Sequence, residues 1–166
     1  LAAAEPARAK EMDALLSGFL RDTEAVIPVR NPAYSPFSGC VPRGCEVSVS
    51  NGVLTVRGTS PAPFIGIGAG RGARGPVRVS LRVRAAAPGD GKVECLAPAG
   101  RGAPPPRSAP FALAGGGAWQ TVGVEVPGDV PVGIVRVYLP ARQQPVDVDW
   151  IEIRLAGEAR PLRLNF

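Results

Sequence analysis

An Asn-Gly dipeptide at residues 51–52 lies between two runs in which valine or leucine alternates with polar residues. Asn-Gly supplies the two positive-φ residues of a type I′ turn, the tight turn that joins the strands of a β-hairpin. Such a turn places Val49 opposite Leu54 and Val47 opposite Val56, so the four apolar side chains share one side. The sequence therefore predicts an antiparallel hairpin with one apolar face.

The same alternation recurs along the chain. Residues 77–84 alternate four apolar side chains with three arginines and a serine, and residues 122–126 and 135–139 repeat the pattern. In residues 146–155 the apolar parity shifts near Trp150, which predicts a β-bulge or a bend between sheets. About eight strands without intervening helices predict a mainly β fold, an antiparallel β-sandwich of jelly-roll type.

Glycine- and proline-rich segments separate these strands. Gly-Asp-Gly at residues 89–91 predicts a turn, and residues 97–110, rich in Pro, Gly and Arg, predict a long surface loop. Residues 66–73 superficially resemble a phosphate-binding glycine loop. That mechanism needs a helix N-terminus after the loop, and here a strand follows. We therefore interpret residues 66–73 as a loop between strands.

The beginning of the chain has a helical pattern instead. Pro6 suits a first helical turn, and three prolines between residues 26 and 36 enforce an extended connector. We divide the chain into residues 1–38, an amphipathic helix and its connector, and residues 39–166, the β-sandwich. No run approaches the ~20 apolar residues of a transmembrane helix. The residues that recur at the spacing of one helix face are Met12, Leu15, Leu16, Phe19 and Leu20.

The chain has three cysteines, Cys40, Cys45 and Cys95. The first two are close enough in sequence to close a small loop by a disulfide if the protein is exported. Cys95 shares its strand parity with Val93, which predicts a buried thiol that packs as a small apolar side chain. The sequence leaves the disulfide state open.

The chain contains no histidine. This excludes the commonest general base, Ser-His and Cys-His nucleophile pairs, and histidine-ligated metal sites. Residues 40–43 (Cys-Val-Pro-Arg) partly resemble Cys-x-Pro-x-Arg, the motif whose cysteine becomes the formylglycine nucleophile of sulfatases. Here arginine follows proline directly, and Gly44 stands where the motif needs arginine. We therefore expect no enzymatic activity from this chain by itself.

Four residues are candidates for binding a glycan. Arg71 and Arg74 carry guanidinium groups that bind sulfate or carboxylate, and Trp119 and Tyr138 carry rings suited to stacking on a sugar. The alternatives are a solvated surface for the arginines, since a net charge of +5 is mild, and core packing for the aromatic residues. Nucleic acid is not an expected partner, because base stacking needs aromatic residues interleaved with the arginines.

Asp147 and Asp149 project to the same face of one strand. Carboxylates at this spacing could help to hold a structural Ca²⁺ ion, which takes six or more oxygen ligands. Only these two carboxylates can be named, so pairing of both with arginines is the alternative. No other cofactor is expected.

Two stretches resemble known families. Residues 12–34 resemble the end of the catalytic region in bacterial arylsulfatase-like enzymes, where a last amphipathic helix leads into Thr-x-Ala-x-x-Pro-x-x-Asn-Pro-x-Tyr. Residues 146–153 (Val-Asp-Val-Asp-Trp-Ile-Glu-Ile) look like the last strand of carbohydrate-binding jelly rolls. The residues that match the first pattern are Thr23, Ala25, Pro28, Asn31, Pro32 and Tyr34.

The resemblance implies a secreted or periplasmic parent that hydrolyses sulfate esters with formylglycine and Ca²⁺, and none of the catalytic residues of that family is found here. It places this chain as a non-catalytic C-terminal accessory module that packs on the upstream catalytic domain and helps to hold an anionic or sulfated polysaccharide. The alternative hypothesis is a structural or protein-attachment β-sandwich with no ligand.

Overall fold

A computed structural model of the chain describes residues 5–23, 39–100, 102–142 and 144–166. The chain divides into two compact units, Leu1–Tyr34 and Ser35–Phe166, which we describe separately. The expected Pro-rich connector and the expected boundary after residue 38 fall within residues 24–38, outside the described residues.

The first unit contains one helix, α1 (Pro6–Asp22). Its presence confirms the helical prediction, and proline occupies its first position, where no backbone N–H is needed. The apolar stripe of α1 is exposed: Met12, Leu15, Leu16 and Phe19 are between 56% and 68% exposed. Among the described residues, no helix is long and apolar enough to cross a membrane.

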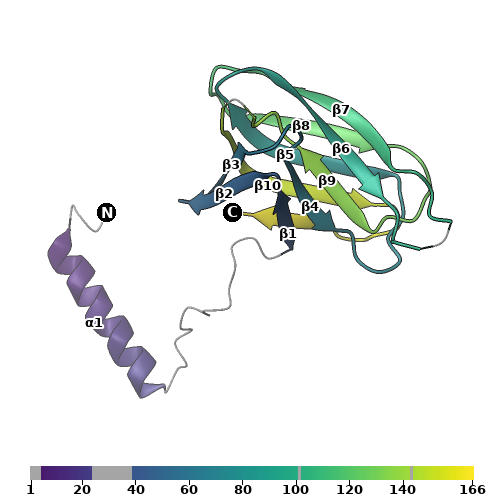
Figure 1. Cartoon of the computed structure of the whole chain (residues 1–166). Helices are drawn as coiled ribbons and strands as arrows, with labels where there is room; N and C mark the ends of the chain where they lie inside the picture. The colour runs from purple at the N-terminus through teal and green to yellow at the C-terminus, as the bar shows by residue number, and fades with distance from the viewer. Residues whose placement is uncertain (1–4, 24–38, 101, 143) are drawn as a thin grey trace. The chain divides into compact units, whose positions relative to one another are not determined.

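The second unit is a β-sandwich of two antiparallel sheets, as predicted (Figure 1). The five-strand sheet has the order β1-β4-β9-β6-β7, and its strands are β1 (Cys40–Arg43), β4 (Phe64–Gly68), β9 (Ile134–Tyr138), β6 (Gly89–Leu96) and β7 (Arg107–Leu113). The six-strand sheet has the order β2-β3-β10-β5-β8, with β11 also paired to β10. Its strands are β2 (Cys45–Ser50), β3 (Val53–Gly58), β10 (Val146–Leu155), β5 (Val77–Ala85), β8 (Gln120–Val126) and β11 (Leu162–Asn165).

Alternate residues of both sheets face inward and form the core. In β5 the even-numbered residues face solvent, whereas Val77, Val79, Leu81 and Val83 are at most 1% exposed. Ile65 and Ile67 of β4 are fully buried in the same way from the other sheet. Among the described residues no polar or charged residue is buried, so apolar burial between the two sheets provides the main stabilisation.

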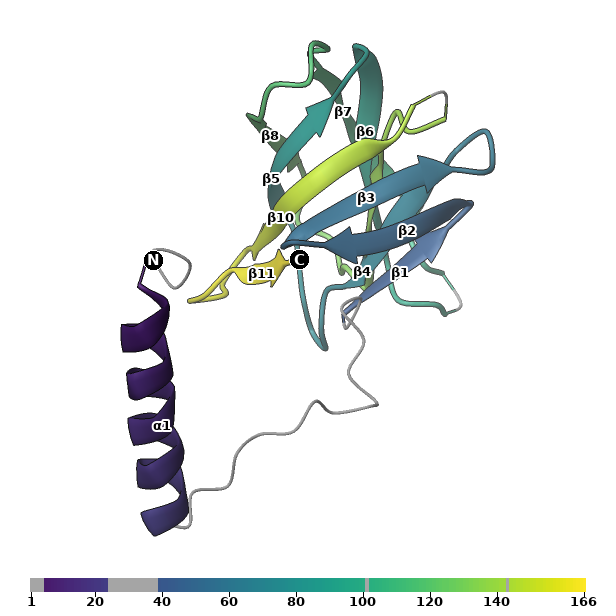
Figure 2. The ribbon, with the colours of Figure 1, turned by 90° about the vertical axis from the view of Figure 1, so that its left-hand side faces the viewer.

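The predicted hairpin and bulge are both present. Asn51 and Gly52 have φ values of 51° and 75°, and β2 pairs with β3 in the expected register. In β10 the pairing with β5 shifts between Val148 and Trp150, where the apolar parity changes. Figure 2 shows β10 beside β3 and β11 in the six-strand sheet.

Three sequence-based predictions of loops are wrong in whole or in part. Residues 66–68, the beginning of the predicted loop 66–73, belong to β4. Residues 89–91 form the beginning of β6 rather than a turn, and residues 107–110 belong to β7 rather than to a surface loop. β7 is an edge strand, where a proline such as Pro110 is tolerated because its missing N–H faces solvent. The proline-rich composition therefore concealed a strand.

All three cysteines are free in the structure, so the small disulfide that the spacing allowed is not formed. Cys40 and Cys45 lie in strands of different sheets. Cys95 is 5% exposed, which confirms its predicted burial. Burial, together with the charge of neighbouring Glu94, raises the pKa of the Cys95 thiol to about 11.

Candidate functional site

The outer face of the five-strand sheet carries a groove of about 340 Å³, within the size range of small-ligand sites. It crosses β1, β4 and β9, and we call it the sheet-face groove. The inward residues of β4 and β9 are fully buried, which fixes the alternate residues on the outer face. The groove is lined by Val41, Arg43, Phe64, Gly66, Ile67, Gly68, Ile134 and Arg136.

Two glycines of β4 create the floor of this groove. A Cβ atom at Gly68 would meet no heavy atom within 4 Å, and one at Gly66 would meet nothing closer than 3.5 Å. Val41 on β1 is 49% exposed and Ile134 on β9 is 43% exposed, so apolar walls stand on both sides. The alternation of glycine with buried isoleucine in β4 therefore leaves space between two exposed apolar side chains.

An aromatic pair borders the groove. The ring centroids of Phe64 and Tyr138 lie 5.0 Å apart, at an interplanar angle of 44°. The Arg136 guanidinium lies over the Phe64 ring at 4.9 Å, and the Lys92 ammonium lies over the Tyr138 ring at 4.5 Å. Cations at these distances are attracted to the ring faces, and this attraction holds both side chains in place beside the groove.

Glu94 connects these polar groups. Its carboxylate accepts hydrogen bonds from Lys92 Nζ at 3.2 Å, from Arg136 Nη1 at 3.2 Å and from the Tyr138 hydroxyl at 3.1 Å. Desolvation by partial burial acts to raise the pKa of Glu94, but the three hydrogen bonds and the Lys92 charge outweigh it and lower that pKa. Glu94 therefore stays ionised and orients three side chains next to the groove. We call Glu94, Lys92, Arg136 and Tyr138 the Glu94 network.

Strand register explains why residues distant in sequence meet here. Arg43 lies opposite Phe64, Phe64 opposite Tyr138, and Tyr138 opposite Lys92, in one row across four strands. The parallel row next to it runs through Val41, Gly66, Arg136 and Glu94. With a spacing of about 4.8 Å between strands, the row from Arg43 to Lys92 spans roughly 14 Å.

The six predicted site residues lie in three separate places. Tyr138 borders the sheet-face groove. Trp119, Asp147 and Asp149 lie on the outer face of the six-strand sheet. Arg71 and Arg74 lie between β4 and β5, where Arg74 Nε is 2.8 Å from Asp129 Oδ1. The two predicted arginines and the two predicted aromatic residues therefore do not form one site, and ligand binding by any of them stays a prediction.

On the outer face of the six-strand sheet, both predicted metal ligands are paired with arginines. Arg84 Nε lies 2.9 Å from Asp147 Oδ2, and Arg82 Nη1 lies 3.0 Å from Asp149 Oδ2. Both guanidinium groups also cover Trp119, at 4.7 Å and 5.4 Å from its ring. No group of three His, Cys, Asp or Glu residues suited to a metal occurs in the described parts of the chain. Both carboxylates are therefore paired with arginines, and calcium binding by Asp147 and Asp149 stays a prediction.

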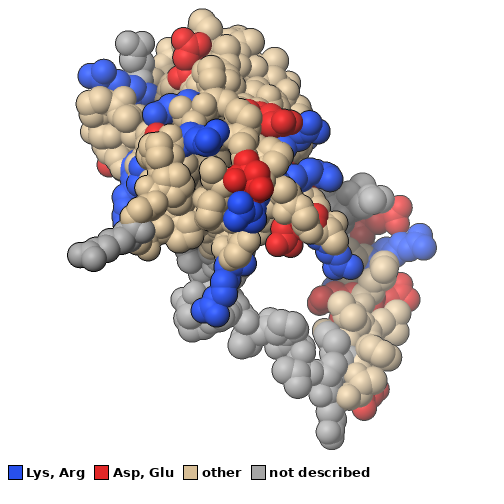
Figure 3. All heavy atoms as spheres, turned by 90° about the vertical axis from the view of Figure 1, so that its right-hand side faces the viewer, with Lys and Arg blue, Asp and Glu red and all other residues tan. Residues whose placement is uncertain are grey.

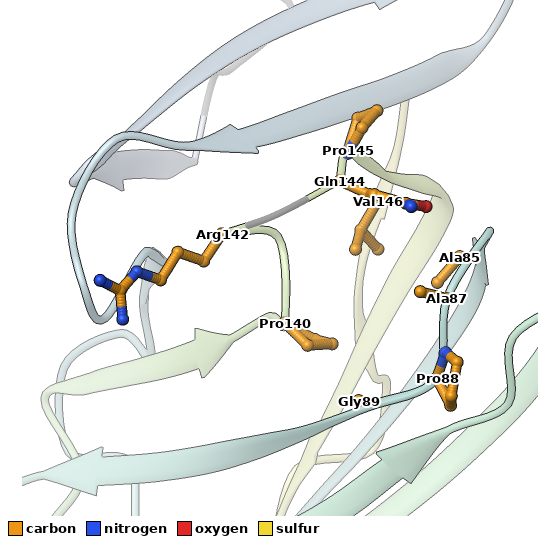
Figure 4. Close-up of a pocket in the computed structure, with 9 residues that line it drawn as sticks. All are labelled: Ala85, Ala87, Pro88, Gly89, Pro140, Arg142, Gln144, Pro145 and Val146. Carbon is orange, nitrogen blue, oxygen red and sulfur yellow. The ribbon is translucent and has the colours of Figure 1, made fainter.

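A second hollow, of about 230 Å³, lies where the β5–β6 and β9–β10 connections meet (Figure 4). Alanine and proline side chains form most of its lining. Figure 4 shows the Arg142 guanidinium pointing away from the other lining residues, which leaves Gln144 as the polar side chain among them. This hollow offers fewer groups for recognition than the sheet-face groove does.

Charge does not separate into one large basic patch on the face shown in Figure 3, where basic and acidic side chains alternate.

Of the residues in and beside the sheet-face groove, the sequence analysis selected Tyr138 and missed the others. The available signal was the pair of glycines at outward positions of an alternating strand, Ile65-Gly66-Ile67-Gly68. Small residues in a strand often mark a place where a ligand or backbone approaches closely.

No family model matches the sequence, and no curated protein matches it. Solved structures of similar fold include a mutant of CBM29-2, a family 29 carbohydrate-binding module, with a TM-score of 0.54 and 10% identity over 72% of this chain and 82% of that chain. The family 29 module CBM29_1 from Piromyces equi matches with a TM-score of 0.51 and 12% identity over 67% of this chain and 76% of its own. PfGH50B matches with a TM-score of 0.50 and 8% identity, and the match covers 72% of this chain and 23% of that protein.

Identities this low show a shared fold. They confirm the antiparallel β-sandwich and place it among the folds of carbohydrate-binding modules. Nothing in these comparisons links residues 12–34 to sulfatases.

Proposed function

We propose that residues 39–166 form a non-catalytic glycan-binding module whose binding site is the sheet-face groove. The observation that carries the proposal is the glycine floor of the groove, set between exposed Val41 and Ile134 and beside the Glu94 network. A sugar ring has apolar C–H faces and a polar hydroxyl edge. The groove offers an apolar surface for the faces and Arg136 for the hydroxyl groups, and Lys92 and Glu94 lie beside it.

The fold supports this proposal. Other sandwiches of this type are carbohydrate-binding modules, and mutants of CBM29-2 are complexed with mannohexaose and with cellulohexaose. Those two hexasaccharides are therefore the first neutral probes for this chain. The walls of the groove stand on the strands that flank β4, about 10 Å apart, which suits a single glycan chain.

The test is to fill the groove without disturbing the fold. Gly68→Leu places an isobutyl group where a Cβ meets nothing within 4 Å. Gly123→Leu is the matched control, because Gly123 is an exposed glycine on β8 of the other sheet whose Cβ position is equally open. Binding of mannohexaose and cellulohexaose is measured by calorimetry, and thermal unfolding verifies that both variants are folded.

We expect wild type and Gly123→Leu to bind at least one hexasaccharide, and Gly68→Leu to bind at least about tenfold more weakly, since the side chain occupies the site. Equal binding by Gly68→Leu and wild type would show that the site lies elsewhere. Absence of binding to any neutral or anionic glycan would overturn the proposed function and favour a structural or attachment module. The exposed stripe of α1 is the observation that favours that second candidate.

The parent protein is a separate part of the proposal. A secreted sulfatase, with this chain as its accessory module packed on an upstream catalytic domain, rests on the resemblance of residues 12–34 alone. The match that covers 23% of PfGH50B supports the narrower point that this fold occurs within a larger chain. A Cys-x-Pro-x-Arg or Ser-x-Pro-x-Arg motif encoded upstream of Leu1 would support the sulfatase, and an upstream reading frame without either motif would contradict it.

A further inference from the structure

We infer that the glycan held in the sheet-face groove is anionic, with Arg43 and Arg136 binding its carboxylate or sulfate groups. The inference rests on the proposed function and assigns a ligand class to the same groove. It moves the anion site from Arg71 and Arg74, which the sequence favoured, to two arginines that line the groove.

The first argument is the balance of charge on the two outer faces. On the six-strand sheet, three arginines each pair with one carboxylate: Arg78 with Glu125, Arg82 with Asp149 and Arg84 with Asp147. Two further arginines of that sheet, Arg154 and Arg163, share Glu152. Around the groove, three cations face one carboxylate. They are Arg43, Lys92 and Arg136, and the carboxylate is Glu94. Arg43 and Arg136 line the groove, whereas Lys92 and Glu94 lie beside it on β6. Asp90 also faces outward on β6, but it lies beyond the row of Lys92, further from the groove.

The second argument is the availability of hydrogen-bond donors. Glu94 already accepts from three groups, so it neutralises little further charge. It engages only Nη1 of Arg136, and a guanidinium has five N–H donors. Arg43 is exposed and makes no ion pair within the described residues. Both side chains therefore have N–H donors left over, and the planar guanidinium group binds carboxylate or sulfate in a bidentate way.

The third argument is placement around one ring. Arg43 lies directly opposite Phe64 in the register of β1 and β4. The guanidinium of Arg136 lies over that same ring, 4.9 Å from its centroid. Arg43 and Arg136 thus both lie next to Phe64, which precedes the glycine floor along β4, and both line the groove in which the sugar would pack.

The experiment compares a hexamer of galacturonic acid, a sulfated carrageenan hexamer and neutral mannohexaose by calorimetry with the full chain. Arg43→Gln removes one guanidinium and leaves the Glu94 network intact. Arg71→Gln is the matched control, because it removes an exposed arginine outside the groove. The carboxylated and sulfated arms decide which acidic group the groove prefers.

We expect Arg43→Gln to weaken binding of an anionic hexamer about tenfold or more, the range of a charged hydrogen bond. Arg43→Gln should weaken binding of mannohexaose far less than binding of the anionic hexamers, and Arg71→Gln should leave all three ligands unaffected. Raising the ionic strength from about 0.05 M to about 0.3 M should weaken anionic binding only, because salt screens exposed charges.

Two results would overturn the inference while leaving the proposed function intact. One is that mannohexaose binds as tightly as both anionic hexamers and Gly68→Leu abolishes it. The other is that Arg71→Gln, rather than Arg43→Gln, loses anionic binding, while Gly68→Leu still abolishes binding of mannohexaose. If no glycan binds at all, the proposed function itself fails.

Discussion

The guanidinium of Arg136 on β9 lies over the ring of Phe64 on β4, 4.9 Å from its centroid. The same guanidinium donates to Glu94 on β6 at 3.2 Å. One side chain thus joins three neighbouring strands of the five-strand sheet on their outer face. Phe64 and Glu94 are therefore coupled through Arg136. Substitutions at either position test how much these outer-face contacts contribute to the free energy of unfolding.

Phe64→Ala is expected to lower both stability and glycan binding. The ring is half-buried and packs against Tyr138, so its removal should cost about 1–3 kcal/mol in the free energy of unfolding, less than a fully buried phenylalanine. Denaturant unfolding measures this loss. A change below about 0.5 kcal/mol would show that the ring contributes no more than an ordinary surface residue does.

Acid should weaken the network at Glu94. The pKa of Glu94 is lowered in the folded state, so its contribution to stability is present at neutral pH and is lost as pH falls through the folded-state pKa, below the ordinary value of 4.5. Glu94→Gln lacks this ionisation. The free energy of unfolding of wild type should therefore exceed that of Glu94→Gln near pH 7, and the difference should shrink below pH 4.5. A difference that does not change with pH would contradict this account.

Local patterns in the sequence predicted most of the sandwich. The Asn-Gly turn determined the β2–β3 register, and the parity shift near Trp150 located the bulge of β10. Both are properties of adjacent residues. The prediction failed at residues 107–110, because an edge strand that contains proline cannot be distinguished from a loop by its amino-acid composition.

The groove could not be predicted in the same way. It depends on the order β1-β4-β9-β6-β7, which places Arg43, Phe64, Tyr138 and Lys92 in one row. Strand order is a long-range property, and no short motif encodes it. Two candidates chosen for their chemistry, Trp119 and Asp147, lie on the outer face of the other sheet. Arg84 covers the ring of Trp119 there and pairs with Asp147.

Calcium gives a direct test of the sequence-based metal hypothesis. Because Arg84 and Arg82 already pair with Asp147 and Asp149, we expect chelation of calcium to leave the midpoint of thermal unfolding unchanged. Any ion bound only by the folded state would raise that midpoint. A midpoint that falls on chelation and recovers with calcium but not magnesium would support the predicted calcium site.

The thiols should differ in reactivity. Burial raises the pKa values of Cys40 and Cys45, and that of Cys95 reaches about 11, so at pH 8 roughly one Cys95 in a thousand is the reactive thiolate. Cys45 is only half-buried and should be alkylated before Cys40 and Cys95. Mass spectrometry of the native protein follows the order, and the unfolded chain, in which all three react, is the control. Early labelling of Cys95 would contradict its burial.

Substitution by alanine should lower the free energy of unfolding at one glycine of the five-strand sheet and leave it nearly unchanged at another. At Gly91 a Cβ would lie 2.6 Å from the Tyr138 carbonyl oxygen and would also overlap the Phe111 ring. Backbone cannot give way there, so Gly91→Ala should lower the free energy of unfolding by about 1–3 kcal/mol. Gly68→Ala meets nothing within 4 Å and should change it by less than about 0.5 kcal/mol. Denaturant unfolding of both variants measures the contrast, and equal losses would mean that the groove floor is a packed surface rather than an open one. Because Gly68→Ala adds only a methyl group, it should also retain hexasaccharide binding that Gly68→Leu loses, which separates filling of the groove from any loss of fold.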